Sequence, residues 1–259
     1  MMLKSAIALT GLLAGGLLTL GTAPAQAFSF TTNTAPGSNA PKGNILLQSV
    51  TLGSGEVVDN FAFVNSAQII YNDAYKGGNS GAASSDRGDN ATGIKNENPV
   101  NADIVASLGN NNLNNIIDTE DQGKFTINVF FSSVVDKLFF WERGQNSKLG
   151  VQAVDASGNL LGTKLVMDSA FWGSAGYSID TTEIVGAQRV GSLGVSLADL
   201  GVSGPIAGVQ LTSLKTYNGP DFKVVGAAAS VPEPATVAGI VAVAGAMAAS
   251  RRRKAAKQA

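Results

Sequence analysis

The chain of 259 residues contains no cysteine and no histidine. Without cysteine there are no disulfide bonds, so the fold depends on its core and on any ions it binds. Without histidine the chain cannot form imidazole-ligated zinc or iron sites, and it cannot carry Ser-His-Asp or Cys-His catalysis. The chemistry that remains is that of carboxylates, hydroxyls, amides and lysine amines, together with calcium binding through oxygen ligands.

The N-terminus contains a short apolar run behind a single positive charge. Lys4 precedes the apolar residues 6–20, and Ala25-Gln26-Ala27 is a small-x-small cleavage site. This pattern predicts a signal peptide over residues 1–27, which passes through the Sec translocon and is cleaved after Ala27. The alternative is a permanent N-terminal anchor, and the short run and the well-placed cleavage site argue against it.

A second apolar run lies near the C-terminus. It follows Val231-Pro232-Glu233-Pro234, an extended elbow whose prolines cannot join a helix. Residues 235–250 are uncharged and rich in Ala and Gly, and the basic tail 251–259 begins with Arg251, Arg252 and Arg253. The run predicts a weak transmembrane helix, suited to a temporary anchor, with the basic tail held in the cytoplasm.

The order of Pro-Glu-Pro motif, apolar helix and Arg-rich tail resembles the PEP-CTERM sorting signal of bacterial surface proteins. The resemblance covers residues 231–259, about a tenth of the chain. It implies that an exosortase cuts near Pro232-Glu233-Pro234 and removes the helix. The implied localisation is export, a transient anchor in the inner membrane, and then the cell surface, outer envelope or extracellular matrix.

The charge of the chain changes when both signals are set aside. The whole chain has a net charge of −1, whereas residues 28–231 hold 12 basic and 18 acidic residues, a net charge of −6. Sequence-independent binding of nucleic acid needs clustered cations, so we expect no nucleic-acid partner. The body of roughly 200 residues is long enough for one domain with a substantial core.

Within this body, residues 28–230, short apolar runs alternate with turn residues. Strands are predicted at 44–52, 57–71, 124–131, 137–142, 148–155, 160–167, 187–197, 206–211 and 222–226. Ser157-Gly158-Asn159 predicts a hairpin between 151–155 and 160–164. The pattern indicates an all-β fold and a single β-sandwich of jelly-roll or carbohydrate-module type, with a closed barrel as the alternative.

Residues 73–103 break the pattern, because they contain almost no large apolar side chains and many Gly, Ser, Asn and Asp. Such a segment cannot order itself by packing alone, so we predict a long, flexible polar loop. Ile104, Val105 and Leu108 then recur at helical spacing and predict a short helix within 101–113, with Asn101 as its N-cap.

Two polar clusters are candidate calcium sites. Asp86, Asp89 and Asn90 offer oxygen ligands on a Gly-containing loop, without the spacing of an EF-hand. The same loop holds an Arg-Gly-Asp tripeptide, and its plain interpretation is a solvated loop with a chance motif. Asp118-Thr119-Glu120-Asp121 gathers three acids, for which a solvated turn is the favoured interpretation. Apart from this calcium alternative we expect no cofactor.

Aromatic residues suggest a second kind of binding site. Trp141, Trp172 and Tyr177 are candidates for a platform on which sugar rings stack. The favoured interpretation places Trp141 in the core and leaves Trp172, which precedes Gly173, as the exposed ring. Glu142 and Arg143 are expected to form an ion pair at an edge or in a loop.

The body also resembles exosortase-dependent surface proteins of cyanobacterial type, in the segments 140–147, 195–201 and 219–224. The resemblance implies a β-rich body and supplies no catalytic residues. We therefore predict a non-enzymatic protein with a structural or adhesive role in an exopolysaccharide layer or biofilm matrix. The alternatives are a carbohydrate-binding module and a secreted glycoside hydrolase, which would need two carboxylates across a cleft.

Overall fold

The computed structural model describes residues 27–77, 81–86, 96–181 and 186–229. The predicted sorting signal and, apart from Ala27, the predicted signal peptide lie outside these ranges. Within them the protein is all-β, with fourteen strands and one α-helix, which confirms the predicted class. None of the helices in the described ranges has the length and apolar character needed to cross a membrane.

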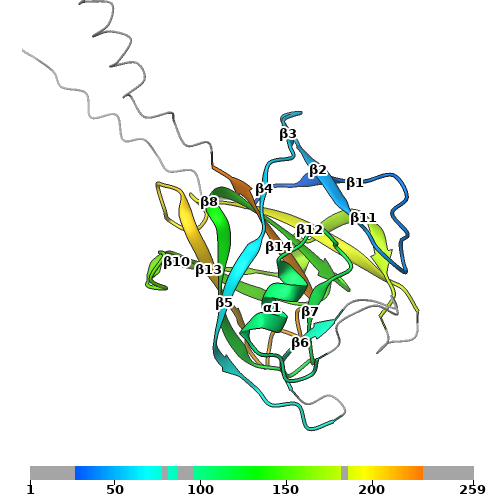
Figure 1. The fold of residues 1–259 in the computed structure, drawn as a ribbon, viewed down its shortest axis with the longest axis vertical. Coiled ribbons are helices and arrows are strands. Elements are labelled where there is room, and N and C mark those ends of the chain that lie inside the picture. The colour runs from blue at the N-terminus through cyan, green and yellow to red at the C-terminus, as the bar shows by residue number, and fades with distance from the viewer. Residues whose placement is uncertain (1–26, 78–80, 87–95, 182–185, 230–259) are drawn as a thin grey trace, which may run out of the picture.

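The strands form two antiparallel sheets (Figure 1). Their bounds are β1 (Phe30–Thr34), β2 (Leu47–Leu52), β3 (Val57–Val58), β4 (Phe61–Ala62), β5 (Val64–Asn72), β6 (Ala83–Asp86), β7 (Ile116–Thr119), β8 (Phe125–Arg143), β9 (Leu149–Val154), β10 (Leu160–Met167), β11 (Gly173–Ile179), β12 (Gln188–Ser196), β13 (Ile206–Ser213) and β14 (Phe222–Ala228). The helix α1 spans Asn101–Leu108, and a short 3-10 helix, η1, spans Ser169–Phe171. Strands β1 to β3 form the small sheet, and the other strands form the large one.

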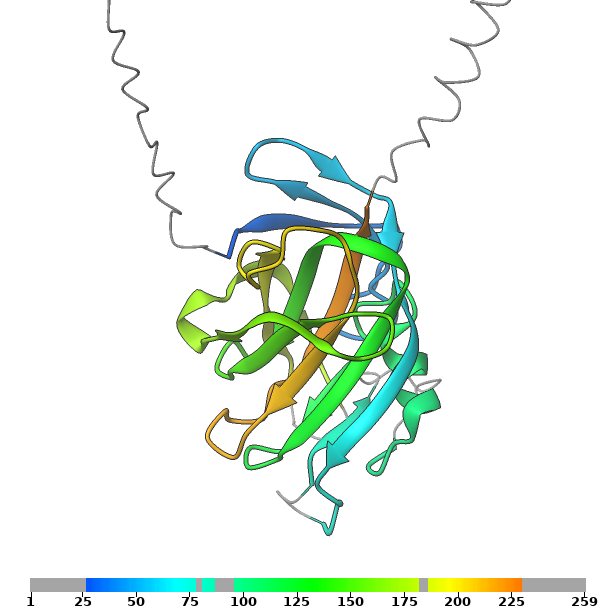
Figure 2. The ribbon, with the colours of Figure 1, turned by 90° about the vertical axis from the view of Figure 1, so that its left-hand side faces the viewer.

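The long strand β8 organises the large sheet. Its first half, from Phe125 to Phe131, pairs with β5 on one side and β13 on the other. Its second half, from Val135 to Arg143, pairs with β12 and β14. Next to the first half of β8, the sheet extends from β13 to β9 and then to β10. Next to the second half, it extends from β12 to β11. Because β8 bends between its halves, the large sheet curls around the core (Figure 2).

Two hydrophobic cores lie on opposite faces of the second half of β8. Leu138 and Phe140 belong to the larger core, which also contains the inward side chains of the first half. Phe139 and Trp141 point to the other face and join Phe30 of the small sheet in a second core. Successive residues of a strand face opposite sides, so this half of β8 is buried on both. A strand buried on both faces shows no apolar–polar alternation in its sequence.

Two local predictions are confirmed. The hairpin of β9 and β10 turns through Gly158, which has a φ of +83°. The predicted helix is α1, but its N-cap is Val100. The Val100 N–H donates to the Asp103 carboxylate at 2.8 Å. Asn101 does not cap the helix, because its side-chain oxygen accepts from the Ile69 N–H of β5 at 2.9 Å.

The prediction of a continuous polar loop over 73–103 is wrong in part. Residues 83–86 form β6, which pairs antiparallel with β7, Ser84 opposite Asp118. Ladder hydrogen bonds to β7 order this segment in place of large apolar contacts. Just before it, the backbone of Gly81 and Ala82 lies so close to Gly123 that a Cβ at position 123 would collide with it. Strands β1, β7 and β11 also have no counterpart among the predicted strands, and β8 joins two that the sequence separates at 131–137.

Candidate functional site

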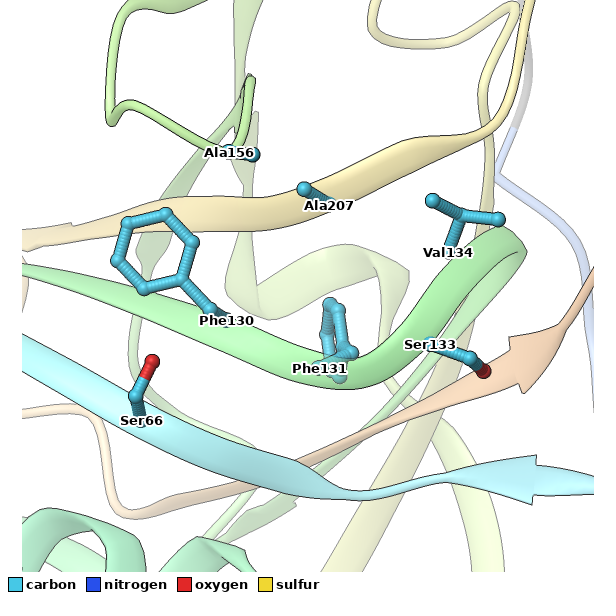
Figure 3. A pocket seen from close by; sticks show the side chains of 7 residues that line it. All are labelled: Ser66, Phe130, Phe131, Ser133, Val134, Ala156 and Ala207. Carbon is cyan, nitrogen blue, oxygen red and sulfur yellow. The ribbon is translucent and has the colours of Figure 1, made fainter.

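An open depression of about 380 Å³ lies at the bend of β8 (Figure 3). The side chains that line it come from β5, β8, β13 and the β9–β10 turn. They are Ser66, Phe130, Phe131, Ser133, Val134, Ala156 and Ala207. Figure 3 shows the Phe130 ring between Ala156 and Ser66, with Ala207 and Val134 further along the same space.

The depression exists because β8 holds more residues here than its neighbours. Between Phe130 and Val135 the strand advances five positions, while β13 advances only from Gly208 to Ile206. The additional residues bulge outward and are exposed. The bend is anchored at both ends: the Ser132 N–H donates to the Phe63 carbonyl at 2.8 Å, and the Val134 carbonyl accepts from the Ala229 N–H at 2.9 Å.

Gly208 makes room for the Phe130 ring. The two residues lie opposite each other on β13 and β8. A Cβ at position 208 would lie 3.1 Å from the ring edge of Phe130 and would also collide with the Val129 carbonyl oxygen. The glycine therefore lets the half-buried ring lie on the outer face of the sheet, across β13, while Val129 and Phe131 face the core.

A row of four amide side chains crosses the outer face beside the ring. In register they are Gln68 of β5, Asn128 of β8, Gln210 of β13 and Gln152 of β9. Gln210 donates to the Asn128 side-chain oxygen at 3.0 Å. Four adjacent strands place the ends of this row roughly 14 Å apart, a span comparable with a short oligosaccharide.

The β9–β10 turn covers part of this row. A Cβ at Gly158 would lie 3.3 Å from Asn128 Nδ2, 3.8 Å from Phe130 Cζ and 3.9 Å from Gln68 Oε1. The turn is held by Asp155, whose carboxylate accepts from the N–H groups of Ser157 at 2.8 Å and Asn159 at 2.9 Å. Hydrogen bonds from Asn159 lower the pKa of Asp155, so the turn keeps its acceptor ionised.

The seven lining residues of the depression include no ionisable side chain. They provide the rings of Phe130 and Phe131, aliphatic groups and two serine hydroxyls, with the Gln68 amide nearby. This set can contact the apolar face of an uncharged ligand and hydrogen-bond its hydroxyl groups. It offers neither an acid and base for proton transfer nor a nucleophile activated by a base.

A buried charge network lies at the other end of β8. Arg143 donates to Asp118 at 2.9 Å, to Asp221 at 2.7 Å and to the Thr181 hydroxyl at 2.7 Å. All four residues are buried. Burial raises the pKa of Asp221 to about 6, although the Arg143 charge acts against this. The network joins β7 and β8 to Asp221, which directly precedes β14, and its enclosure indicates a structural role.

Two predictions about these acids are corrected by the network. Asp118 does not lie in a solvated turn, because it pairs with Arg143 inside the protein. Glu142 and Arg143 do not form an edge ion pair, because adjacent strand residues point to opposite faces. Glu142 Oε2 instead accepts from the Gln145 N–H at 2.6 Å. Burial raises the pKa of Glu142 to about 7, against the opposing effects of Ser147, Gln145 and Arg143.

The proposed aromatic platform is not assembled. Trp141 is 1% exposed, belongs to the second core and donates its indole N–H to Thr32 Oγ1 at 2.9 Å. Trp172 is 8% exposed, belongs to the larger core and donates to the Ser147 carbonyl at 3.0 Å. The prediction that Trp172 is exposed is therefore wrong. Tyr177 is half-buried, with its hydroxyl inside, and burial raises its pKa well above the usual range.

The other predicted site residues fall mainly outside the described ranges. Asp86 ends β6, whereas Asp89 and Asn90 lie outside. So do Ala25 and the sorting residues Val231, Pro232, Glu233, Pro234, Arg251, Arg252 and Arg253. In the part of the chain that the structure describes, no three acidic side chains gather as a metal site would require.

Sequence reasoning missed Phe130 and the depression. One signal was present, since the interval between the strands predicted at 124–131 and 137–142 coincides with the bend. The comparisons with known proteins add no assignment: no protein-family model matches the chain, and no curated protein or solved structure matches it either.

Proposed function

We propose that this is an exported, non-enzymatic surface or matrix protein whose body binds an uncharged polysaccharide at the depression beside Phe130. The observation that carries the proposal is an aromatic ring on the outer face of the sheet, flanked by hydroxyl and amide groups. None of the residues that line the depression is charged. Rings of this kind stack on the apolar faces of sugars, and hydroxyls and amides bond their equatorial groups.

The charge of the protein argues for a neutral glycan. The body carries a net charge of −6, and the depression holds no cation to offset it. An anionic polysaccharide would be repelled at low ionic strength. Hydrolysis is disfavoured because two carboxylates would have to face the bound sugar, and none lines the depression.

The route to the surface rests on the two terminal signals. Sec export, a transient membrane helix at 235–250 and exosortase processing at Pro232-Glu233-Pro234 remain proposals from their sequence patterns. The geometry of the body is compatible with them. The Phe28 N–H pairs with Gly194, opposite Phe139 of β8, and Ala229 pairs with Val134. The N-terminal end of the described body thus lies along β12, one strand away from β8, and its C-terminal end lies at the bend of β8.

The body is proposed to be a β-sandwich of carbohydrate-module type. Support comes from β8, whose two halves belong to sheet regions that enclose the larger core between them. An outer sheet face crossed by amides and an aromatic ring is a suitable glycan surface for such a fold.

Affinity electrophoresis in gels that contain neutral or anionic polysaccharides tests the binding proposal. We expect neutral polysaccharides to retard the wild type, and Phe130→Ala to abolish the retardation. Phe171→Ala removes a ring that is 58% exposed on η1 and should bind as the wild type does. Unchanged retardation of Phe130→Ala, or binding of anionic glycans only, would overturn the proposal.

A further inference from the structure

Strand β14 carries a completely buried lysine, Lys223, that hydrogen-bonds to the side-chain amide of an asparagine just after α1. Lys223 is 0% exposed. Its Nζ lies 2.6 Å from the carbonyl oxygen of Ser107, in the last turn of α1, and 3.3 Å from Oδ1 of Asn110. The amine is thus held against the carboxamide of a residue more than a hundred positions away in the chain.

The surroundings fix the orientation of the Asn110 amide. Its Oδ1 accepts from the Asn112 N–H at 2.9 Å and from Asn115 Nδ2 at 3.1 Å. Its Nδ2 donates to the Ala106 carbonyl at 2.7 Å. Donors placed around a carbonyl oxygen stabilise the negative charge that the oxygen gains when a nucleophile adds to its carbon. The Asn110 Cγ is therefore an activated electrophile.

The amine has the properties of a nucleophile. A buried ammonium loses its hydration, and burial lowers the pKa of Lys223 well below its usual range. Desolvation thus favours the neutral amine of Lys223 over its ammonium form, and the neutral amine carries the lone pair needed for attack on a carbonyl carbon. The Ser107 carbonyl accepts from Nζ and, at 3.4 Å, from Asn110 Nδ2, so both nitrogens meet at one acceptor.

We propose that Lys223 and Asn110 join in an intramolecular isopeptide bond. The Lys223 Nζ forms a bond to Cγ of Asn110 while the bond between Cγ and Nδ2 breaks. One proton passes from Nζ to the departing nitrogen, which leaves as ammonia. The reaction is a transfer of an acyl group between two amines, so it requires no oxidant, reductant or additional reagent.

The bond would tie the end of α1 to the final strand of the body. β14 is the strand from which the chain leaves toward the proposed anchor. A covalent link there restricts the unfolded chain much as a disulfide does, in a protein that has no cysteine.

Peptide mapping of the full-length protein tests the bond directly. After denaturation and trypsin digestion, mass spectrometry should find a branched peptide that contains Asn110 and Lys223 and lacks the mass of one ammonia. The unbranched peptides should be correspondingly depleted. Linear peptides in full yield would overturn the proposal and leave Lys223 as a hydrogen-bond donor to the last turn of α1. Loss of ammonia without a branch would indicate cyclisation of an asparagine and would also overturn it.

Variants separate the bond from folding. Asn110→Asp keeps the shape of the electrophile, and its branched product should lack one water in place of one ammonia. Asn110→Ala should give no branch. Lys124→Met removes an exposed lysine and should leave the branch intact. The peptide map of the wild type tests the bond by itself. The proposal therefore stays testable even if Asn110→Ala does not fold.

Discussion

The buried carboxyl of Glu142 should make the protein less stable as the pH rises. Its pKa is about 7 in the folded protein, against 4.5 for an ordinary glutamate, chiefly because burial penalises the ionised form. The folded state therefore binds its proton more tightly than the unfolded state does. Below about pH 4.5 both states are protonated and the stabilisation is complete, and it is lost as the pH rises through about 7.

The size of the effect follows from the shift. Each pKa unit corresponds to about 1.4 kcal/mol, so a shift from 4.5 to about 7 is worth about 3 kcal/mol of unfolding free energy. Glu142→Gln is an isosteric mimic of the protonated acid. It should match the wild type at pH 4.5 and exceed its stability by up to about 3 kcal/mol at pH 8.

Urea denaturation at a series of pH values measures this difference. The gain in unfolding free energy of Glu142→Gln over the wild type should grow between about pH 4.5 and pH 7 and then level off. Glu56→Gln, at a carboxylate that is about half exposed beside Lys137, serves as the surface control. If the Glu142→Gln and wild-type curves run parallel, or if the variant is less stable at pH 8, the assignment of a buried, protonated Glu142 is refuted.

Two further substitutions test the scaffold by thermal or urea denaturation. Gly208→Ala should destabilise the protein by about 1–3 kcal/mol, because its Cβ would overpack against β8, and Gly204→Ala, with open space around position 204, should change little. Arg143→Met should cost about 3–5 kcal/mol at pH 8, because it leaves Asp118 and Asp221 buried without their cation. A loss near zero for Arg143→Met would show that water reaches these carboxylates.

The sequence predicts the local elements better than their long-range partners. The β9–β10 hairpin follows from turn chemistry within Ser157-Gly158-Asn159, and α1 follows from apolar spacing. Both signals lie within a few residues of the structure they specify. Strand β7 is short, and its register depends on β6 and β14, so its own four residues carry little signal.

The site depends on contacts that a local pattern does not contain. Phe130 and Phe131 are adjacent aromatics on one strand, and only one can face the core. Gly208, on β13, admits Phe130 to the outer face, a relation that spans 78 positions. The hydrogen bond from Arg143 to Asp221 also joins residues that are 78 positions apart in the chain. The sequence shows each of these residues, but it does not show which of them lie next to each other in the folded protein.

The segment 140–147 contributes to the scaffold and not to the depression. Phe140 lies in the larger core, Arg143 holds the charge network, and the Ser147 carbonyl accepts from Trp172. None of these groups lines the depression at the bend of β8. A segment with buried partners on several strands tolerates little change, while an outer sheet face can vary at low cost in stability. Substitutions of the outward-facing residues beside Phe130 should therefore alter binding at the proposed site with little loss of stability, whereas substitutions within 140–147 should destabilise the fold.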